Sequence, residues 1–227
     1  MSAEGPLSFG QSDPSSGALR HLLPQGEKEF GPTLVGTVSG NLVDLLWPDW
    51  REIALGDIAH GLARIPRFLG QKHRTISVLE HSLAVGNMLT INLRLAGLLH
   101  DAHEYLFGDL VTPVANALKS RGGFRTGNAI ERIKSDLDLA ICRRVVEDFA
   151  PAALETSAEV EAAALRDALH SPSVKLADAR AYGVERNWAP KSAEFYDDLE
   201  PPPRLLEIRW LDLVSALARA RFAGVVR

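Results

Sequence analysis

From Trp50 onward, the apolar residues of this chain recur at spacings of three and four, the period of one face of an α-helix. The first such stretch runs from Ile53 to Ile65 and stops at Pro66. Strand-like patterns occur in two short segments around Ser39-Gly40, residues 33–38 and 41–46. We therefore predict an all-α fold with a short N-terminal β-hairpin.

The chain divides by composition into three parts. Residues 1–32 are rich in Gly, Ser and Pro, which predicts a flexible leader. Residues 33–200 carry the helical pattern and are expected to form the main domain. In residues 201–227, Pro201-Pro202-Pro203 forms a stiff spacer before an amphipathic helix. We expect this last helix to pack on the core or to form an oligomer interface.

Several local signals predict where the helices lie. Ser77 followed by Glu80 reads as a capping box, so a helix is expected to begin there. A second helix is expected from Leu93 to Tyr105, and Gly108 breaks the chain after it. Further helices are expected to begin near residue 112 and to cover residues 128–149, 157–170 and 175–182.

Charge and cysteine content exclude several classes of function. The formal net charge of −4 gives no basic field for a polynucleotide, so no nucleic acid polymer is expected as a partner. Cys142 is the single cysteine, so a metal site must use His, Asp and Glu. No apolar stretch approaches the roughly 18 residues that span a bilayer, and the N-terminus lacks a secretory signal pattern. We expect no membrane partner and a cytoplasmic location.

The adjacent pair His100-Asp101 ends an apolar run and has the residue types of half a metal site. His81 lies upstream and Asp178 far downstream, each on a separate predicted helix. Two imidazoles and two carboxylates would leave coordination positions open on a six-coordinate divalent ion, for a water and a phosphoryl oxygen. Together these residues follow the order His, His-Asp, Asp.

This order resembles the signature of the HD-domain metal-dependent phosphohydrolase superfamily, whose all-helical bundle binds a divalent metal through those four side chains. Four segments resemble its bacterial 5′-deoxynucleotidases: Glu80-His81-Ser82, His100-Asp101-Ala102-His103-Glu104, Gly108-Asp109-Leu110-Val111-Thr112-Pro113-Val114 and Lys175-Leu176-Ala177-Asp178. Three others resemble bacterial and phage HD phosphohydrolases that include dATP triphosphohydrolases: Asp57-Ile58-Ala59-His60-Gly61-Leu62, Arg67-Phe68-Leu69-Gly70 and Ile76-Ser77-Val78-Leu79-Glu80-His81-Ser82.

The resemblance also implies roles for side chains around the metal. Glu104 would assist the nucleophilic water. Asp109 would position water or act as a general acid, or else would cap the helix that begins near residue 112. Arg64, in the segment Arg64-Ile65-Pro66, is the first candidate for a phosphate clamp, and Arg67 is the second. The family has an aromatic residue where this chain has Ile65, which puts a stacking contact there in doubt.

Other charged and aromatic residues are weaker candidates. Lys119, Lys72 and His73 would add positive charge for a longer phosphate chain, or would be ordinary surface residues. Lys175 would orient Asp178 or face solvent. Tyr182 and Trp188 would line the pocket or pack in the core. Three further histidines are left out of the metal shell because four ligands are already present: His60, His103 and His170.

The sequence thus predicts a metal-dependent phosphohydrolase that releases phosphate from deoxynucleoside 5′-monophosphates. The alternatives are a deoxynucleoside triphosphate triphosphohydrolase and a non-catalytic metal or nucleotide sensor. The expected cofactor is one divalent ion (Mn, Co, Mg, Zn or Fe). The expected partners are the nucleotide substrate and further copies of the chain in a homo-oligomer.

Overall fold

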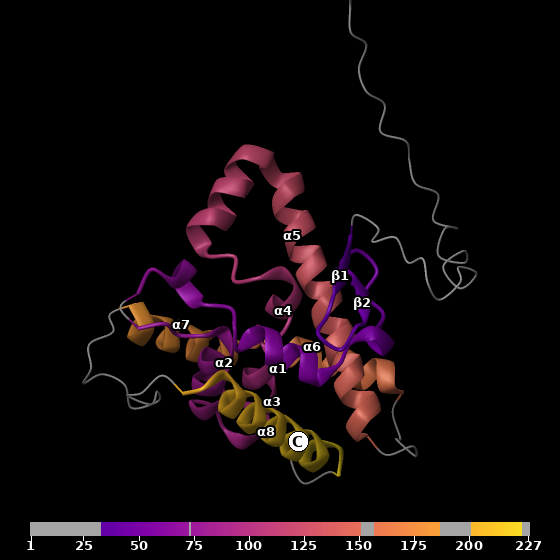
Figure 1. Ribbon diagram of the computed structural model, residues 1–227. Helices are drawn as coiled ribbons and strands as arrows, with labels where there is room; N and C mark the ends of the chain where they lie inside the picture. The colour runs from indigo at the N-terminus through magenta and orange to yellow at the C-terminus, as the bar shows by residue number, and fades with distance from the viewer. Residues whose placement is uncertain (1–32, 73, 151–156, 187–200, 224–227) are drawn as a thin grey trace, which may run out of the picture. The chain divides into compact units, whose positions relative to one another are not determined.

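The computed structural model describes residues 33–72, 74–150, 157–186 and 201–223 (Figure 1). The chain from Leu34 onward forms one compact unit. The flexible leader predicted for residues 1–32 lies outside the described residues, as do His73 and Trp188.

The two predicted strands form an antiparallel hairpin. Strand β1 spans Leu34–Gly36 and strand β2 spans Leu42–Asp44, with Val35 opposite Val43. Gly40 closes the turn with a φ of 87°, a backbone conformation that glycine adopts at little cost. The prediction of a short hairpin is confirmed.

The described chain after the hairpin is helical, which confirms the all-α prediction. The short 3₁₀ turns are η2 (Trp50–Glu52) and η3 (Arg67–Gly70). The α-helices are α1 (Leu55–Leu62), α2 (Val78–Asn87), α3 (Ile91–Leu99), α4 (Glu104–Phe107), α5 (Thr112–Phe149), α6 (Ala158–Leu169), α7 (Pro172–Arg186) and α8 (Pro203–Phe222). Across the described ranges, none of these helices combines the length and the apolar character needed to cross a membrane.

Helix α2 runs through the core and begins at the predicted cap. The Ser77 hydroxyl accepts a hydrogen bond from the Glu80 amide at 3.1 Å. Helix α3 packs closely on α2 because Gly97 lies against it: a Cβ at Gly97 would come within 2.4 Å of the Leu89 side chain and 3.2 Å of the Gly86 Cα. This close approach brings two chain segments that carry predicted ligands near each other.

Two helix boundaries differ from the prediction. The helix expected over residues 93–105 is interrupted, because α3 ends at Leu99 and α4 begins at Glu104. The His-Asp pair lies in the turn between these helices, with His100 as the C-terminal cap of α3. Helix α5 joins two segments expected to be separate and breaks at Gly123, where φ is 68° and Figure 1 shows a sharp change of direction.

Helix α8 packs on α1 and α3. Trp210 is fully buried, and its indole N–H donates to the Leu98 carbonyl oxygen at 2.9 Å. Val214 and Ala218 follow at helical spacing and are also fully buried. Of the two roles that the sequence left open for this helix, the structure shows packing on the core.

Candidate metal centre

Four polar side chains from separate parts of the fold meet beside the core. His81 comes from α2, His100 and Asp101 from the turn after α3, and Asp178 from α7. His81 Nε2 lies 3.3 Å from His100 Nε2 and 3.2 Å from Asp178 Oδ1. Asp101 Oδ2 lies 3.1 Å from His100 Nε2 and 3.5 Å from His81 Nε2. The structure therefore brings together the four predicted ligands.

These distances suit a shared metal ion. Imidazole nitrogens and carboxylate oxygens bind divalent ions such as zinc at about 2.0–2.2 Å, so two neighbouring ligands at a right angle lie about 3 Å apart. The four atoms are 3.1–3.5 Å from their neighbours in the cluster. Two nitrogens and two oxygens also form a donor set that suits borderline and hard divalent cations.

The hydrogen bonds on the far sides of the two imidazoles decide which ring atoms face the cluster. His81 Nδ1 lies 2.7 Å from a Glu185 carboxylate oxygen, and His100 Nδ1 lies 2.9 Å from the Gly97 carbonyl oxygen. Both partners accept hydrogen bonds, so both Nδ1 atoms carry the proton in the neutral rings. The two Nε2 lone pairs then point into a space that also holds two carboxylates, an arrangement that requires a positive charge.

The pKa values of His100 and Asp101 also indicate that the cluster favours a positive charge. Burial opposes the charged imidazole, yet Asp101 raises the pKa of His100 to about 9. Burial likewise opposes an ionised Asp101, yet His100, His81 and Arg67 hold the pKa of that carboxyl well below its ordinary value. The cluster therefore stabilises a cation, whether a proton or a metal ion.

Glu185 supports both the cluster and a neighbouring arginine, and sequence reasoning missed it. Its side chain is fully buried on α7, where one oxygen pairs with His81. The other oxygen accepts a 2.8 Å hydrogen bond from Arg67 Nε. Glu185 lies seven residues after Asp178, which is two helical turns and thus the same face of α7. That spacing was the signal that could have revealed it.

A cavity of about 690 Å³ opens beside the cluster. Arg67, Asp101 and Asp178 line it, together with Glu104, Asp109 and Lys134. Arg67 Nη1 lies 3.6 Å from Asp101 Oδ2, so the guanidinium lies at the edge of the metal cluster. Phe68 and Tyr182 also line the cavity, with their ring centroids 5.6 Å apart. The cavity thus combines predicted metal ligands, cations, acids and an aromatic surface.

Glu104 and Asp109 are acids suited to proton transfer in this cavity. Burial, followed by the neighbouring Asp101 and Asp109, raises the pKa of Glu104 to about 9. Burial also raises the pKa of Asp109, although Arg67 and the Phe68 amide oppose the shift. Asp109 accepts a 3.2 Å hydrogen bond from the Phe68 amide. It does not cap α5, because Val111 is the capping residue.

Arg64 and Lys119 are not brought to the cluster. Arg64 follows α1 and donates to Glu207 of α8 at 2.5 Å and to the His60 carbonyl oxygen at 2.8 Å. Lys119 lies on the first arm of α5 and pairs with Glu131 of the second arm at 3.1 Å. Neither residue lines the cavity. The arginine that lies next to the cluster is Arg67, which was the second candidate for the phosphate clamp in the sequence.

The remaining candidates have varied surroundings. Lys72 donates to the Arg186 carbonyl oxygen at 2.9 Å and lies 5.0 Å from the centre of the Phe68 ring. His103 is buried beside the cluster, whereas the side chain of His60 is about one third exposed and faces Glu207. Lys175 lines a second cavity of about 350 Å³, together with His100, Asp101 and Asp178.

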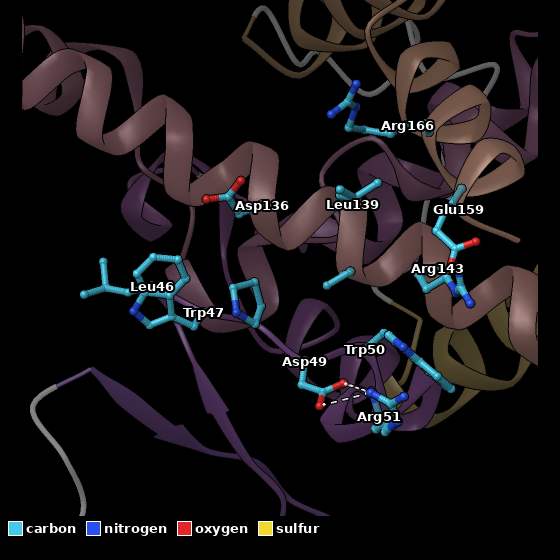
Figure 2. A pocket seen from close by; sticks show the side chains of 14 residues that line it. Leu46, Trp47, Asp49, Trp50, Arg51, Asp136, Leu139, Arg143, Glu159 and Arg166 are labelled. Carbon is cyan, nitrogen blue, oxygen red and sulfur yellow. Dashed lines mark hydrogen bonds and ion pairs between the residues drawn. The ribbon is translucent and has the colours of Figure 1, made fainter. Parts of the chain in front are cut away.

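A hollow of about 720 Å³ lies between the chain after the hairpin and helices α5 and α6 (Figure 2). Figure 2 shows Trp47 and Trp50 on one side and Leu139 and Arg143 of α5 on the other. None of the metal ligands or acids described above lines this hollow. Asp101, Asp178, Glu104 and Asp109 instead line the cavity of about 690 Å³.

Part of the chain is similar to a known protein. No protein-family model matches the chain. A segment of 90 residues is 44% identical to part of an uncharacterized protein of Rhodobacter capsulatus. This match covers 36% of the chain and 46% of the relative, so it spans about half the length of that protein. Because the relative is itself uncharacterized, the match assigns no activity.

Proposed function

We propose that this chain is a divalent-metal-dependent phosphohydrolase that releases phosphate from deoxynucleoside 5′-monophosphates. The observation that carries the proposal is the convergence of four lone-pair atoms, from His81, His100, Asp101 and Asp178, at distances that fit one ion. A buried arginine, Arg67, stands next to this cluster at a cavity large enough for a small ligand. On this proposal the enzyme works in the cytoplasm.

The side chains of the cavity can perform the parts of a phosphoryl hydrolysis. A divalent ion held by the four ligands would supply a Lewis acid and a bound water of lowered pKa. Arg67 can donate to phosphoryl oxygens through the part of its guanidinium that Glu185 does not use. Glu104, with its raised pKa, can exchange a proton with the attacking water. Asp109 can hold water or protonate the leaving oxygen.

The charges of the cavity favour a monophosphate over a triphosphate. Arg67 and Lys134 are the cations among its described lining residues, and four carboxylates lie beside them. A triphosphate tail carries more negative charge and would need more cations than this. The paired rings of Phe68 and Tyr182 offer an apolar surface for a sugar or base. On this proposal, these rings serve in place of the aromatic side chain that Ile65 does not provide.

Two alternatives differ in their products. A triphosphohydrolase would release inorganic triphosphate, and a metal-binding or nucleotide-binding sensor would release nothing. The presence of both Glu104 and Asp109 in the cavity favours catalysis, because a binding module has no need for two acids of raised pKa.

The test is an assay of the full chain with Mn²⁺, Co²⁺ or Mg²⁺ against deoxynucleoside mono- and triphosphates, with free phosphate and triphosphate measured separately. We expect phosphate from monophosphates. Asp101→Ala should abolish both metal binding and turnover, whereas Asp49→Asn, an exposed change beside Arg51, should leave both unchanged. No turnover of any nucleotide by the metal-loaded chain would refute the proposal, and triphosphate release would select the first alternative.

A further inference from the structure

A second group of potential metal ligands lies directly after the first. Asp101, His103 and Glu104 each offer a ligand atom, and these three atoms lie within 4.8 Å of one another. His103 and Glu104 are both buried, at 5% and 6% exposure. Asp101 also contacts the first cluster, because its Oδ2 lies 3.5 Å from His81 Nε2 and 3.1 Å from His100 Nε2. A single carboxylate thus joins the two groups.

Two atoms of this second group have unmet bonding capacity. Neither His103 Nε2 nor Glu104 Oε2 has a hydrogen-bond partner among the described residues, and both atoms are buried. Burying a polar atom without a partner is unfavourable, because its hydrogen bond to water is lost, so such an atom usually has a partner of some kind in the folded state. Two of them on neighbouring residues, next to a shared carboxylate, indicate one common ligand.

The hydrogen bonding of His103 fixes which atom is available to that ligand. His103 Nδ1 lies 2.8 Å from Asp138 Oδ1, and Asp138 is 1% exposed. The carboxylate accepts, so Nδ1 carries the proton and Nε2 carries the lone pair. A carboxylate that accepts a hydrogen bond from the far nitrogen of a histidine ring orients the ring and strengthens its binding to a metal.

We propose that Asp101, His103 and Glu104 hold a second divalent cation, with Asp101 shared between the two ions. The inference rests on the proposed function, because Asp101 is also a ligand in the first cluster. The expected ion is of the Mn²⁺ or Co²⁺ class, since one imidazole and two carboxylates suit such cations. In sites with two ions about 3.5–4 Å apart, the pair binds both the attacking and the leaving oxygen of a displacement.

The local charge balance favours a cation over an empty cluster. Three carboxylates approach one another here, from Asp101, Glu104 and Asp109, and Arg67 and Lys134 are the neighbouring cations. Arg67 is already engaged by Glu185. A second divalent ion would neutralise the remaining charge. The competing arrangement is a single proton shared by the carboxyl groups, and the two differ in the number of metal ions bound.

The experiment counts Mn²⁺ ions bound to the full chain by equilibrium dialysis and records electron paramagnetic resonance spectra. We expect two ions per chain, with a spin-coupled signal. His103→Asn keeps a donor toward Asp138 but removes the ligand atom, so it should bind one ion and lose the coupling. Glu104→Gln should do the same, which provides a second variant if the first is unstable. His170→Gln is the control, because His170 faces the same Asp138 from an exposed position.

The outcomes separate this inference from the proposed function. One ion in the wild-type chain, or two ions retained in both His103→Asn and Glu104→Gln, would overturn the second site and leave a hydrolase with one metal. No bound ion in the wild-type chain would overturn both. Two ions in the wild type and one in both variants, with unchanged circular dichroism, would establish the second site even if no nucleotide were hydrolysed.

Discussion

Arg67 and Glu185 share a 2.8 Å hydrogen bond in which the carboxylate is fully buried and the arginine side chain is 10% exposed. The second oxygen of the same carboxylate lies 2.7 Å from Nδ1 of His81. One buried acid therefore holds both the Arg67 guanidinium and the His81 imidazole, and these two contacts can be separated by substitution.

Replacing Arg67 should impair hydrolysis far more than replacing Arg64. Arg67→Ala removes the charge beside Asp101, and loss of one such electrostatic contact typically lowers kcat by about 10²–10³-fold. Arg64→Ala is the matched control, because that side chain pairs with α8 and should change kcat by less than about threefold. Steady-state kinetics on a deoxynucleoside monophosphate would measure both. Equal losses would contradict the assignment of Arg67.

Glu185→Gln should weaken metal binding without changing the first ligands. The amide keeps the shape but loses the negative charge that holds the Nδ1 side of His81, so we expect about a 10–100-fold loss of Mn²⁺ affinity. Calorimetric titration would measure it. Glu207→Gln, at an equally buried carboxyl on α8, should leave the affinity unchanged. An unchanged affinity in Glu185→Gln would show that the contact only packs the helix.

Metal binding should stabilise the fold. An ion that binds only the folded chain, at about 100 times its dissociation constant, adds about 2.7 kcal/mol to the free energy of unfolding, or about 5–10 °C in Tm for a chain of this size. His81→Gln should lose most of this shift because it removes a central ligand. Thermal scans with Mn²⁺, followed by chelator, would measure the shift and its reversal. The same shift in His81→Gln would place the ion elsewhere.

Glu207 should make stability depend on pH at the α1–α8 contact. Burial opposes its ionisation, but hydrogen bonds from Arg64 and Arg204 hold the pKa of Glu207 below its ordinary value. A carboxyl with a lowered folded pKa stabilises the fold above its unfolded pKa of about 4.3, and this contribution is lost as pH falls through the folded value. Glu207→Gln should therefore cost about 1 kcal/mol at pH 7, a modest figure because its arginine partners are exposed.

Urea unfolding at pH 7 and at pH 3 would test this dependence. The difference between Glu207→Gln and the wild type should shrink toward zero at the lower pH. Glu131→Gln, at an exposed ion pair on α5, should stay within about 0.5 kcal/mol of the wild type at both. A constant difference across the range would mean that the carboxyl acts by packing rather than by charge.

Trp210 should be among the most sensitive positions of the core. Trp210→Ala removes a fully buried ring and its hydrogen bond to Leu98, for an expected cost of about 3–5 kcal/mol. Trp47→Ala removes the same side chain at a position that is 76% exposed and should cost less than about 0.5 kcal/mol. Chemical unfolding compares the two. Similar costs would argue against the packing of α8.

The four side chains that converge were predicted from the resemblance of their order in the sequence to the HD-domain signature. The sequence also predicted the cap at Ser77, since that contact is local. The choice between Arg64 and Arg67 depended on long-range geometry. Pro66 separates them, and Glu207, Glu185 and Asp101 fix their directions from distant parts of the chain.

The errors in helix boundaries have local causes. The turn between α3 and α4 interrupts a pattern that reads as one helix, because its polar residues turn toward the cluster and toward Asp138. The break in α5 follows from Gly122-Gly123, a pair whose conformational freedom was a readable signal. In the sequence, the role of Glu185 was indicated only by its position seven residues after Asp178, on the same face of the helix. One such spacing does not identify a contact unless the fold is known.

Phe68 and Leu69, directly after Arg67, have φ angles of 57° and 56°, a left-handed conformation that bulky side chains seldom adopt. Each such residue costs about 1–3 kcal/mol. A selection for heat resistance alone would therefore favour glycine at these two positions. The same replacement would remove the Phe68 ring from Tyr182 and loosen the chain beside Arg67. Substitutions at this turn should therefore raise thermal stability at the expense of the catalytic rate. In laboratory evolution of the chain, we expect this conflict to appear first at Phe68 and Leu69.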